Sequence, residues 1–143
     1  MLAKKIIVTY FILLFPIWVL SQNRLTDSII QSTSSIKPDS VRLKKISTIT
    51  QALMVSNCED AIVLANYGIS QSKKINHTDL KLQFKSILGY SYKIQGDFKS
   101  SVSVFIEALS ESDSLNNINR SAFIANNLGT TFLEAGKYKE AEY

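Results

Sequence analysis

Residues 88–98 read LGYSYKIQGDF, and 40 positions later residues 128–138 read LGTTFLEAGKY. In both stretches a Leu-Gly pair is followed three positions after its glycine by an aromatic residue, and then by a Gly-x-aromatic triplet. A fixed period of between about 20 and 50 residues is typical of proteins built from stacked structural repeats. The two stretches therefore predict a repeat architecture with a period of about 40 residues.

The copy that begins near residue 79 carries two apolar stripes at helical spacing. One stripe comprises Leu80, Phe84, Ile87, Leu88 and Tyr92, and the other Phe98, Val102, Phe105, Ile106 and Leu109. This spacing gathers the apolar side chains on one face of each helix, and Gly96 between the stripes suits the left-handed residue that ends many helices. We therefore expect an all-α chain, with helices over residues 41–55, 59–75, 79–95, 98–114, 119–135 and from 138 onward.

Three glycines fall inside these expected helices, where glycine costs about 1 kcal/mol relative to alanine. We expect Gly68, Gly89 and Gly129 to be retained because a neighbouring helix approaches closely there. The single cysteine, Cys58, falls in the slot that Phe98 and Tyr138 occupy in the later copies. A half-buried structural thiol is the expectation for it.

The repeated residues resemble the tetratricopeptide repeat, whose pattern is W-x2-L-G-x2-Y…A-x3-F…P on paired helices. The second copy offers Leu88-Gly89-x2-Tyr92 and then Ser101-x3-Phe105, whereas Lys85 and Ala125 stand where the pattern has tryptophan. The resemblance implies an α-solenoid of helix pairs with a period of about 40 residues. Its repeats would cover residues 41–78, 79–118 and, incompletely, 119–143.

The N-terminus resembles a secretory signal peptide. The segment MLAKK is followed by a 15-residue apolar run from Ile6 to Leu20, and we expect cleavage after Ser21. The run is shorter than the roughly 20 residues that span a bilayer, and Pro16 interrupts it, although an uncleaved anchor stays open. Residues 22–40, rich in Ser and Thr, are expected to form a linker, and the mature protein to be periplasmic or secreted.

Composition and motifs favour a binding protein over an enzyme. The formal net charge is +4, and two of the basic residues, Lys4 and Lys5, belong to the N-terminal segment. The other lysines form no basic stripe, so we expect no nucleic-acid partner. His77 stands in an expected turn without the companions that a metal site or a catalytic site requires. We expect no catalytic residues, no metal and no cofactor.

A surface for a protein or peptide partner is the remaining functional feature. The first helix of each pair lines the concave side of a stack of helix pairs, and polar positions there suit an extended peptide backbone. The expected peptide-binding groove consists of Gln83, Ser86, Tyr90, Lys93, Asn126 and Thr130.

Long-period arrays that open with a signal peptide and a motif like Asp39-Ser40-Val41-Arg42 resemble the exported sensory region of Bacteroidetes-type signalling proteins. This resemblance implies a two-component-type function, with a downstream transmembrane helix and a kinase or DNA-binding output. The alternative is a free-standing adaptor in an envelope assembly. Because the last expected helix has only just begun at Tyr143, the simplest interpretation is a fragment. After signal cleavage, membrane contact would then depend on such a downstream helix.

Overall fold

The computed structural model describes residues 24–141, and within that range the chain is all-helical without a strand. The all-α prediction is confirmed. The expected signal peptide, residues 1–21, lies outside the described residues. The helices are α2 (Arg24–Thr33), α3 (Asp39–Ser56), α4 (Cys58–Lys74), α5 (Thr78–Gln95), α6 (Phe98–Ser114) and α7 (Ile118–Ala141).

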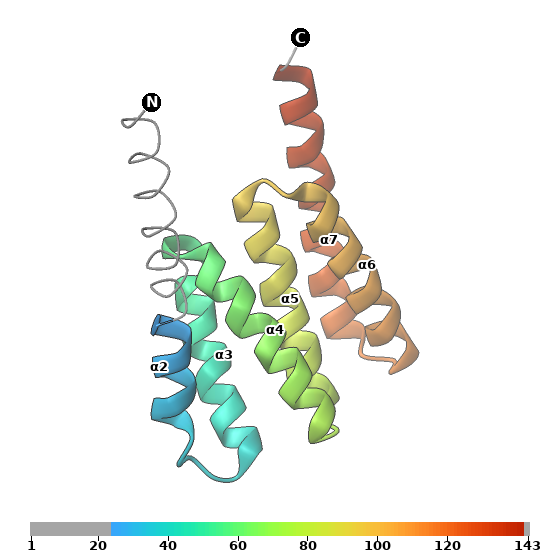
Figure 1. Cartoon of the computed structure of the whole chain (residues 1–143). Coiled ribbons are helices and arrows are strands. Elements are labelled where there is room, and N and C mark those ends of the chain that lie inside the picture. The colour runs from blue at the N-terminus through green and yellow to red at the C-terminus, as the bar shows by residue number, and fades with distance from the viewer. Residues whose placement is uncertain (1–23, 142–143) are drawn as a thin grey trace, which may run out of the picture.

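From α3 to α7 the helices alternate in direction, and each packs against the next one along the chain (Figure 1). Helix α5 also packs against α3 and α7, which are two elements away from it in the sequence. The starts of α3, α5 and α7 lie 39 and 40 residues apart, and those of α4 and α6 lie 40 apart. The described part of the chain is therefore repeat-like at the expected spacing.

The connections between the pairs repeat as well. In the turns before α5 and α7, Asn76 and Asn116 adopt the left-handed conformation with φ of 51° and 53°, which asparagine tolerates better than most residues. The next residue caps the helix in both cases. Nδ1 of His77 accepts from the amide of Leu80 at 3.4 Å, and Oδ1 of Asn117 accepts from that of Arg120 at 3.2 Å. His77, expected to be a solvated turn residue, is the N-cap of α5.

The linker expected over residues 22–40 is wrong for its central part, because residues 24–33 form α2, which packs against α3 and α4. Ile29 and Ile30 contact the core of those helices, and Thr33 is buried. The hydroxyl of Thr33 donates to the carbonyl oxygens of Ile29 at 2.8 Å and Ile30 at 3.1 Å. A threonine that satisfies its hydroxyl on its own helix can be buried in this way.

The turn expected at Gly136 is also absent, and no separate helix begins at residue 138, because α7 runs on to Ala141. At the equivalent site Gly96 ends α5 with a φ of 82°, and the carboxylate of Asp97 then caps α6 by accepting from the amide of Ser100 at 3.0 Å. The third copy has Lys137 in place of Asp97. A lysine has no oxygen to offer as an N-cap, so the second helix lacks its start signal.

The buried side chains form two hydrophobic clusters. The larger one lies between α3, α4 and α5 and is centred on Phe84, and the smaller one joins Leu82 to Phe105, Ala108 and Ile124. Cys58 is half-buried and free, as expected. Ile106, expected in the apolar stripe of α6, is instead 52% exposed, and Ser101 and Ala108 occupy the buried face of that helix.

Two of the three helical glycines make the close contacts expected of them. A Cβ added to Gly68 would lie 2.3 Å from the ring of Phe84, and one added to Gly89 would lie 2.9 Å from the ring of Phe105. Both distances are shorter than van der Waals contact, so an aromatic ring of the next helix fills the space of the missing side chain. The expectation is wrong for Gly129, where an added Cβ would meet nothing within 4 Å.

Candidate functional site

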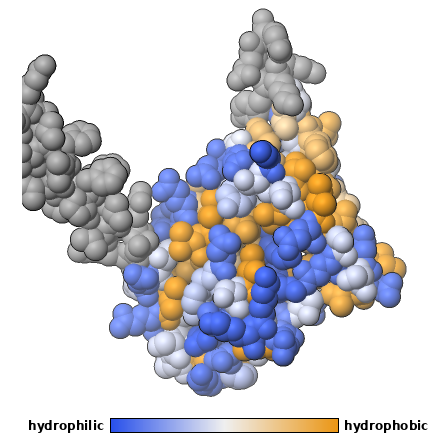
Figure 2. Space-filling view, turned by 45° about the vertical axis from the view of Figure 1, so that its right-hand side comes forward, coloured by the Kyte–Doolittle hydropathy of each residue, from blue (hydrophilic) through white to orange (hydrophobic). Residues whose placement is uncertain are grey.

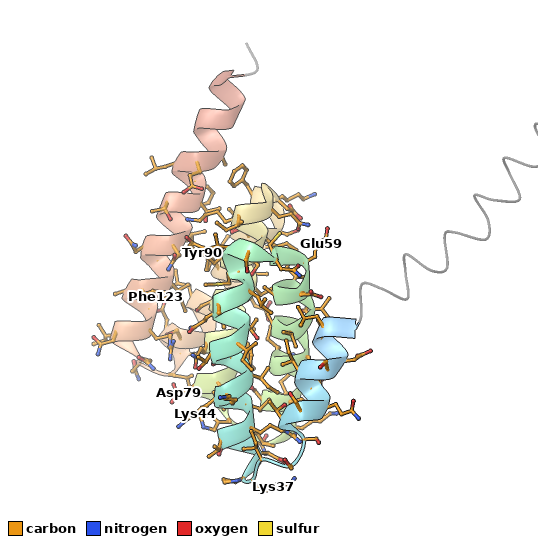
Figure 3. All side chains as sticks on the ribbon, turned by 90° about the vertical axis from the view of Figure 1, so that its left-hand side faces the viewer. Lys37, Lys44, Glu59, Asp79, Tyr90 and Phe123 are labelled. Carbon is orange, nitrogen blue, oxygen red and sulfur yellow. The ribbon has the colours of Figure 1, made fainter. Side chains whose placement is uncertain are left out.

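A hollow of about 290 Å³ opens where α5 lies between α3 and α7. Figure 3 shows Tyr90 and Phe123 on the side of the molecule where this hollow opens, between α3 and α7. All of its lining residues come from the first helices of the three consecutive pairs. They are Gln51, Met54, Gln83, Ser86, Ile87, Tyr90, Arg120, Phe123 and Asn127.

The lining combines an aromatic anchor with amide groups and one cation. Phe123 is 55% exposed, an unusual position for a large aromatic side chain that has no partner to cover it. The side-chain amides of Gln51, Gln83 and Asn127 can each donate and accept hydrogen bonds. Among the described side chains, no carboxylate forms an ion pair with the guanidinium of Arg120. The hollow can therefore offer a peptide apolar contact, backbone hydrogen bonds and one positive charge.

Three of the six residues expected in the groove line the hollow: Gln83, Ser86 and Tyr90. Lys93 and Thr130 lie beside it, bonded to each other. Asn126 points elsewhere and is exposed, and its neighbour Asn127 lines the hollow instead. The difference arises because α7 forms the opposite wall from α5 and therefore contributes a different flank.

Lys93 connects the two walls. Its side chain is only 8% exposed, and its Nζ lies 3.3 Å from Oε1 of Glu134 and 3.4 Å from Oγ1 of Thr130 on α7. The same ammonium group lies 4.7 Å from the centroid of the Tyr90 ring, within cation–π range. Lys93 thus holds α5 against α7 and fixes the ring of Tyr90, with its charge already engaged.

Four charged residues that sequence reasoning passed over form a network between α5 and α6. Nζ of Lys85 lies 2.7 Å from Oε1 of Glu107 and 3.0 Å from Oε2 of Glu111, and Lys81 pairs with Glu111 as well. The side chain of Lys85 is 6% exposed. The sequence signal was available, because two lysines and two glutamates are each spaced i, i+4 on neighbouring helices.

Burial and pairing act in opposite directions on these groups. Burial by itself lowers the pKa of Lys85, but hydrogen bonds to Glu107 and Glu111 outweigh it and raise that pKa above its ordinary value. Partial burial raises the pKa of Glu111, but hydrogen bonds from Lys81 and Lys85 outweigh it and hold that pKa below its ordinary value. At neutral pH all four groups are charged.

We predict that Glu111 makes folding sensitive to acid. A carboxyl whose pKa is lowered by folding stabilises the protein above its ordinary pKa, and this stability is lost as the pH falls through the lowered value. The difference in free energy of unfolding between wild type and Glu111→Gln should therefore be largest near neutral pH and shrink between about pH 6 and about pH 3. Urea titrations at each pH measure it. A difference that stays constant would contradict the assignment.

Within residues 24–141 no group of three or more His, Cys, Asp or Glu side chains is placed to hold a metal ion. Among those same residues no helix is both long and apolar enough to cross a membrane. The site and the helices around it define an all-helical, repeat-like chain with a hollow across its first helices. Comparisons with protein-family models, with curated proteins and with solved structures find no match.

Proposed function

We propose that this chain is a tetratricopeptide-type α-solenoid that acts as an exported scaffold for protein–protein interaction. The hollow across α3, α5 and α7 takes up an extended segment of a protein or peptide partner. The observation that carries the proposal is Phe123, 55% exposed on the rim of this hollow. Aromatic residues in such positions are enriched among those that dominate binding energy.

The hollow suits a segment with one large apolar side chain and a free backbone. The apolar side chain would lie against Phe123 and Met54, while Gln51 and Gln83 exchange hydrogen bonds with the peptide backbone. Arg120 adds a preference for an acidic group nearby. Because Lys93 holds α5 against α7, the hollow is largely preformed, which reduces the entropy lost on binding.

Export rests on the N-terminal segment, and the signalling role on the resemblance of the repeats and of Asp39-Ser40-Val41-Arg42 to exported sensory regions. In this proposal the repeats are the ligand-sensing part of a two-component-type protein. Binding in the hollow would be the input, since α3, α5 and α7 come from different repeats and a ligand touching all three would restrain their relative positions.

We predict that Phe123→Ala abolishes most of the affinity of the hollow for peptides. Peptides selected from a random display library against the wild-type chain should bind Phe123→Ala about 30-fold more weakly, as expected for loss of an aromatic hot spot worth about 2 kcal/mol. Fluorescence anisotropy with labelled selected peptides measures this, at protein concentrations well below any self-association.

Phe132→Ala is the matched control. Phe132 is 54% exposed, on the same helix and to the same extent as Phe123, but it does not line the hollow. Its removal should leave peptide affinity unchanged. Equal losses for the two variants, or a selection that enriches no sequence, would contradict the proposed binding site.

A further inference from the structure

Helix α7 carries a second surface, turned away from the hollow, which we call the α7 stripe. It consists of Ile118, Ala122, Ala125, Gly129, Phe132 and Leu133, all exposed and none of them polar. The largest side chains are the most notable, since Ile118 is 79%, Leu133 67% and Phe132 54% exposed. Figure 2 shows hydrophobic surface gathered on the side of the molecule next to the grey C-terminal atoms.

An internal comparison shows what such a surface is built for. Shifted back by 40 residues, the middle of the stripe falls on Leu82, Lys85 and Gly89, which are all buried. There α6 covers the face of α5, and the ring of Phe105 lies against Gly89. The same face of α7 therefore has the form of a helix–helix contact, yet no described residue of another helix lies within 4 Å of a Cβ at Gly129.

The order of residues along the stripe matches the stripe itself when it is reversed. About a midpoint between Ala125 and Asn126, Ile118 falls opposite Leu133 and Ala122 opposite Gly129. Two such helices running antiparallel would bring their small residues together at the centre, where the backbones can approach closely, with a large side chain against a large one at each end. A two-fold contact requires this kind of self-complementarity.

Charge does not oppose the contact. The stripe contains no ionisable residue, so a copy that meets itself places no like charges opposite each other. The stripe is about 22 Å long, at 1.5 Å per residue over Ile118 to Leu133. Arg120 and Asn127, which line the hollow, lie on a different flank of α7, so the hollow stays open when the stripe is covered.

We propose that the α7 stripe is a homodimer interface, in which α7 pairs antiparallel with α7 of a second copy of this chain. The inference does not rest on the proposed function, because a dimer forms or fails to form whatever the hollow binds. One helix pair is a small interface, so we expect weak association, with a dissociation constant on the order of 10 μM.

Sedimentation velocity of the full chain between about 1 and about 100 μM tests the proposal over the range expected for a small interface. The wild type should shift from monomer to dimer, and Gly129→Glu and Phe132→Ala should each weaken the dimer at least about tenfold. A side chain at Gly129 meets open space within one copy, so Gly129→Glu should fold normally, which its circular dichroism and melting temperature verify. Phe123→Ala, outside the stripe, should dimerise like wild type.

Cysteine crosslinking in a Cys58→Ser background tests the register. Ala125→Cys should form disulfide-linked dimers, and a mixture of Ile118→Cys and Leu133→Cys chains should crosslink with each other but neither with itself. A wild type that stays monomeric at about 100 μM, in a range where even a weak interface would show, overturns the proposal. So does a dimer that Gly129→Glu leaves intact, or one that crosslinks Ile118→Cys with itself.

Discussion

Gly68→Ala is expected to lower the free energy of unfolding by about 1–3 kcal/mol, the usual cost of overpacking a well-filled core. The added methyl carbon would lie 2.3 Å from the ring of Phe84, which is itself fully buried at the centre of the larger hydrophobic cluster. The ring cannot rotate into solvent, so α4 and α5 must move apart. This cost outweighs the gain of about 1 kcal/mol that alanine brings over glycine inside a helix.

Chemical denaturation of three matched variants measures the effect. Gly89→Ala should cost less than Gly68→Ala, because its added carbon lies 2.9 Å from the ring of Phe105. Gly129→Ala should instead be neutral or stabilising by up to about 1 kcal/mol, since its Cβ meets nothing within 4 Å. If the three substitutions changed stability equally, the close packing at Gly68 and Gly89 would be contradicted.

These glycines also show how far the sequence alone could predict the fold. The spacing of Gly89 and Gly96 and of their counterparts 40 residues later predicted the helices and the repeat. It could not predict which helix faces are covered, because coverage depends on neighbours and not on the helix itself. Gly129 therefore received the same prediction as Gly89, although only Gly89 has an aromatic ring against it.

Two errors in the predicted elements had signals that the repeat pattern concealed. Aligning Gly136 with Gly96 predicted a turn, but the residue after each glycine decides whether a helix can start there, and Lys137 cannot cap as Asp97 does. The Ser- and Thr-rich segment before Pro38 resembled a linker by composition. Its isoleucines and threonines are nonetheless spaced for a helix, and α2 forms there.

The candidate site divides in the same way. The residues of α5 that line the hollow followed from the repeat and the helical period. The residues of α7 that line it did not, because the rotation of α7 about its own axis depends on how it packs against α5 and α6. Asn126 was expected, whereas Phe123 and Asn127 face the hollow. Lys93 was assigned to the ligand-facing surface, and the structure places its ammonium group on Glu134 and Thr130.

The largest effect is expected from removing both carboxylates that face Lys85. The double variant Glu107→Gln with Glu111→Gln should be destabilised by about 3–5 kcal/mol, because it leaves a buried ammonium group without a counter-charge. Glu111 should account for more of this loss than Glu107, whose side chain is 70% exposed and screened by solvent. Thermal and urea unfolding measure the loss, with Lys37→Met as a control at an exposed ion pair.

Lys85→Met should behave in the opposite way, although it breaks the same two ion pairs. Glu111 keeps its partner Lys81, and Glu107 remains in solvent, so no buried charge is left alone. The methionine side chain would pack as the apolar residues of the stripe on α5 do, and we expect a change within about 1 kcal/mol. Adding Lys85→Met to the double glutamine variant should restore most of the lost stability. If Lys85→Met alone proved as damaging as the double variant, the network would be stabilising through its ion pairs. The cost would then not come from an uncompensated buried charge.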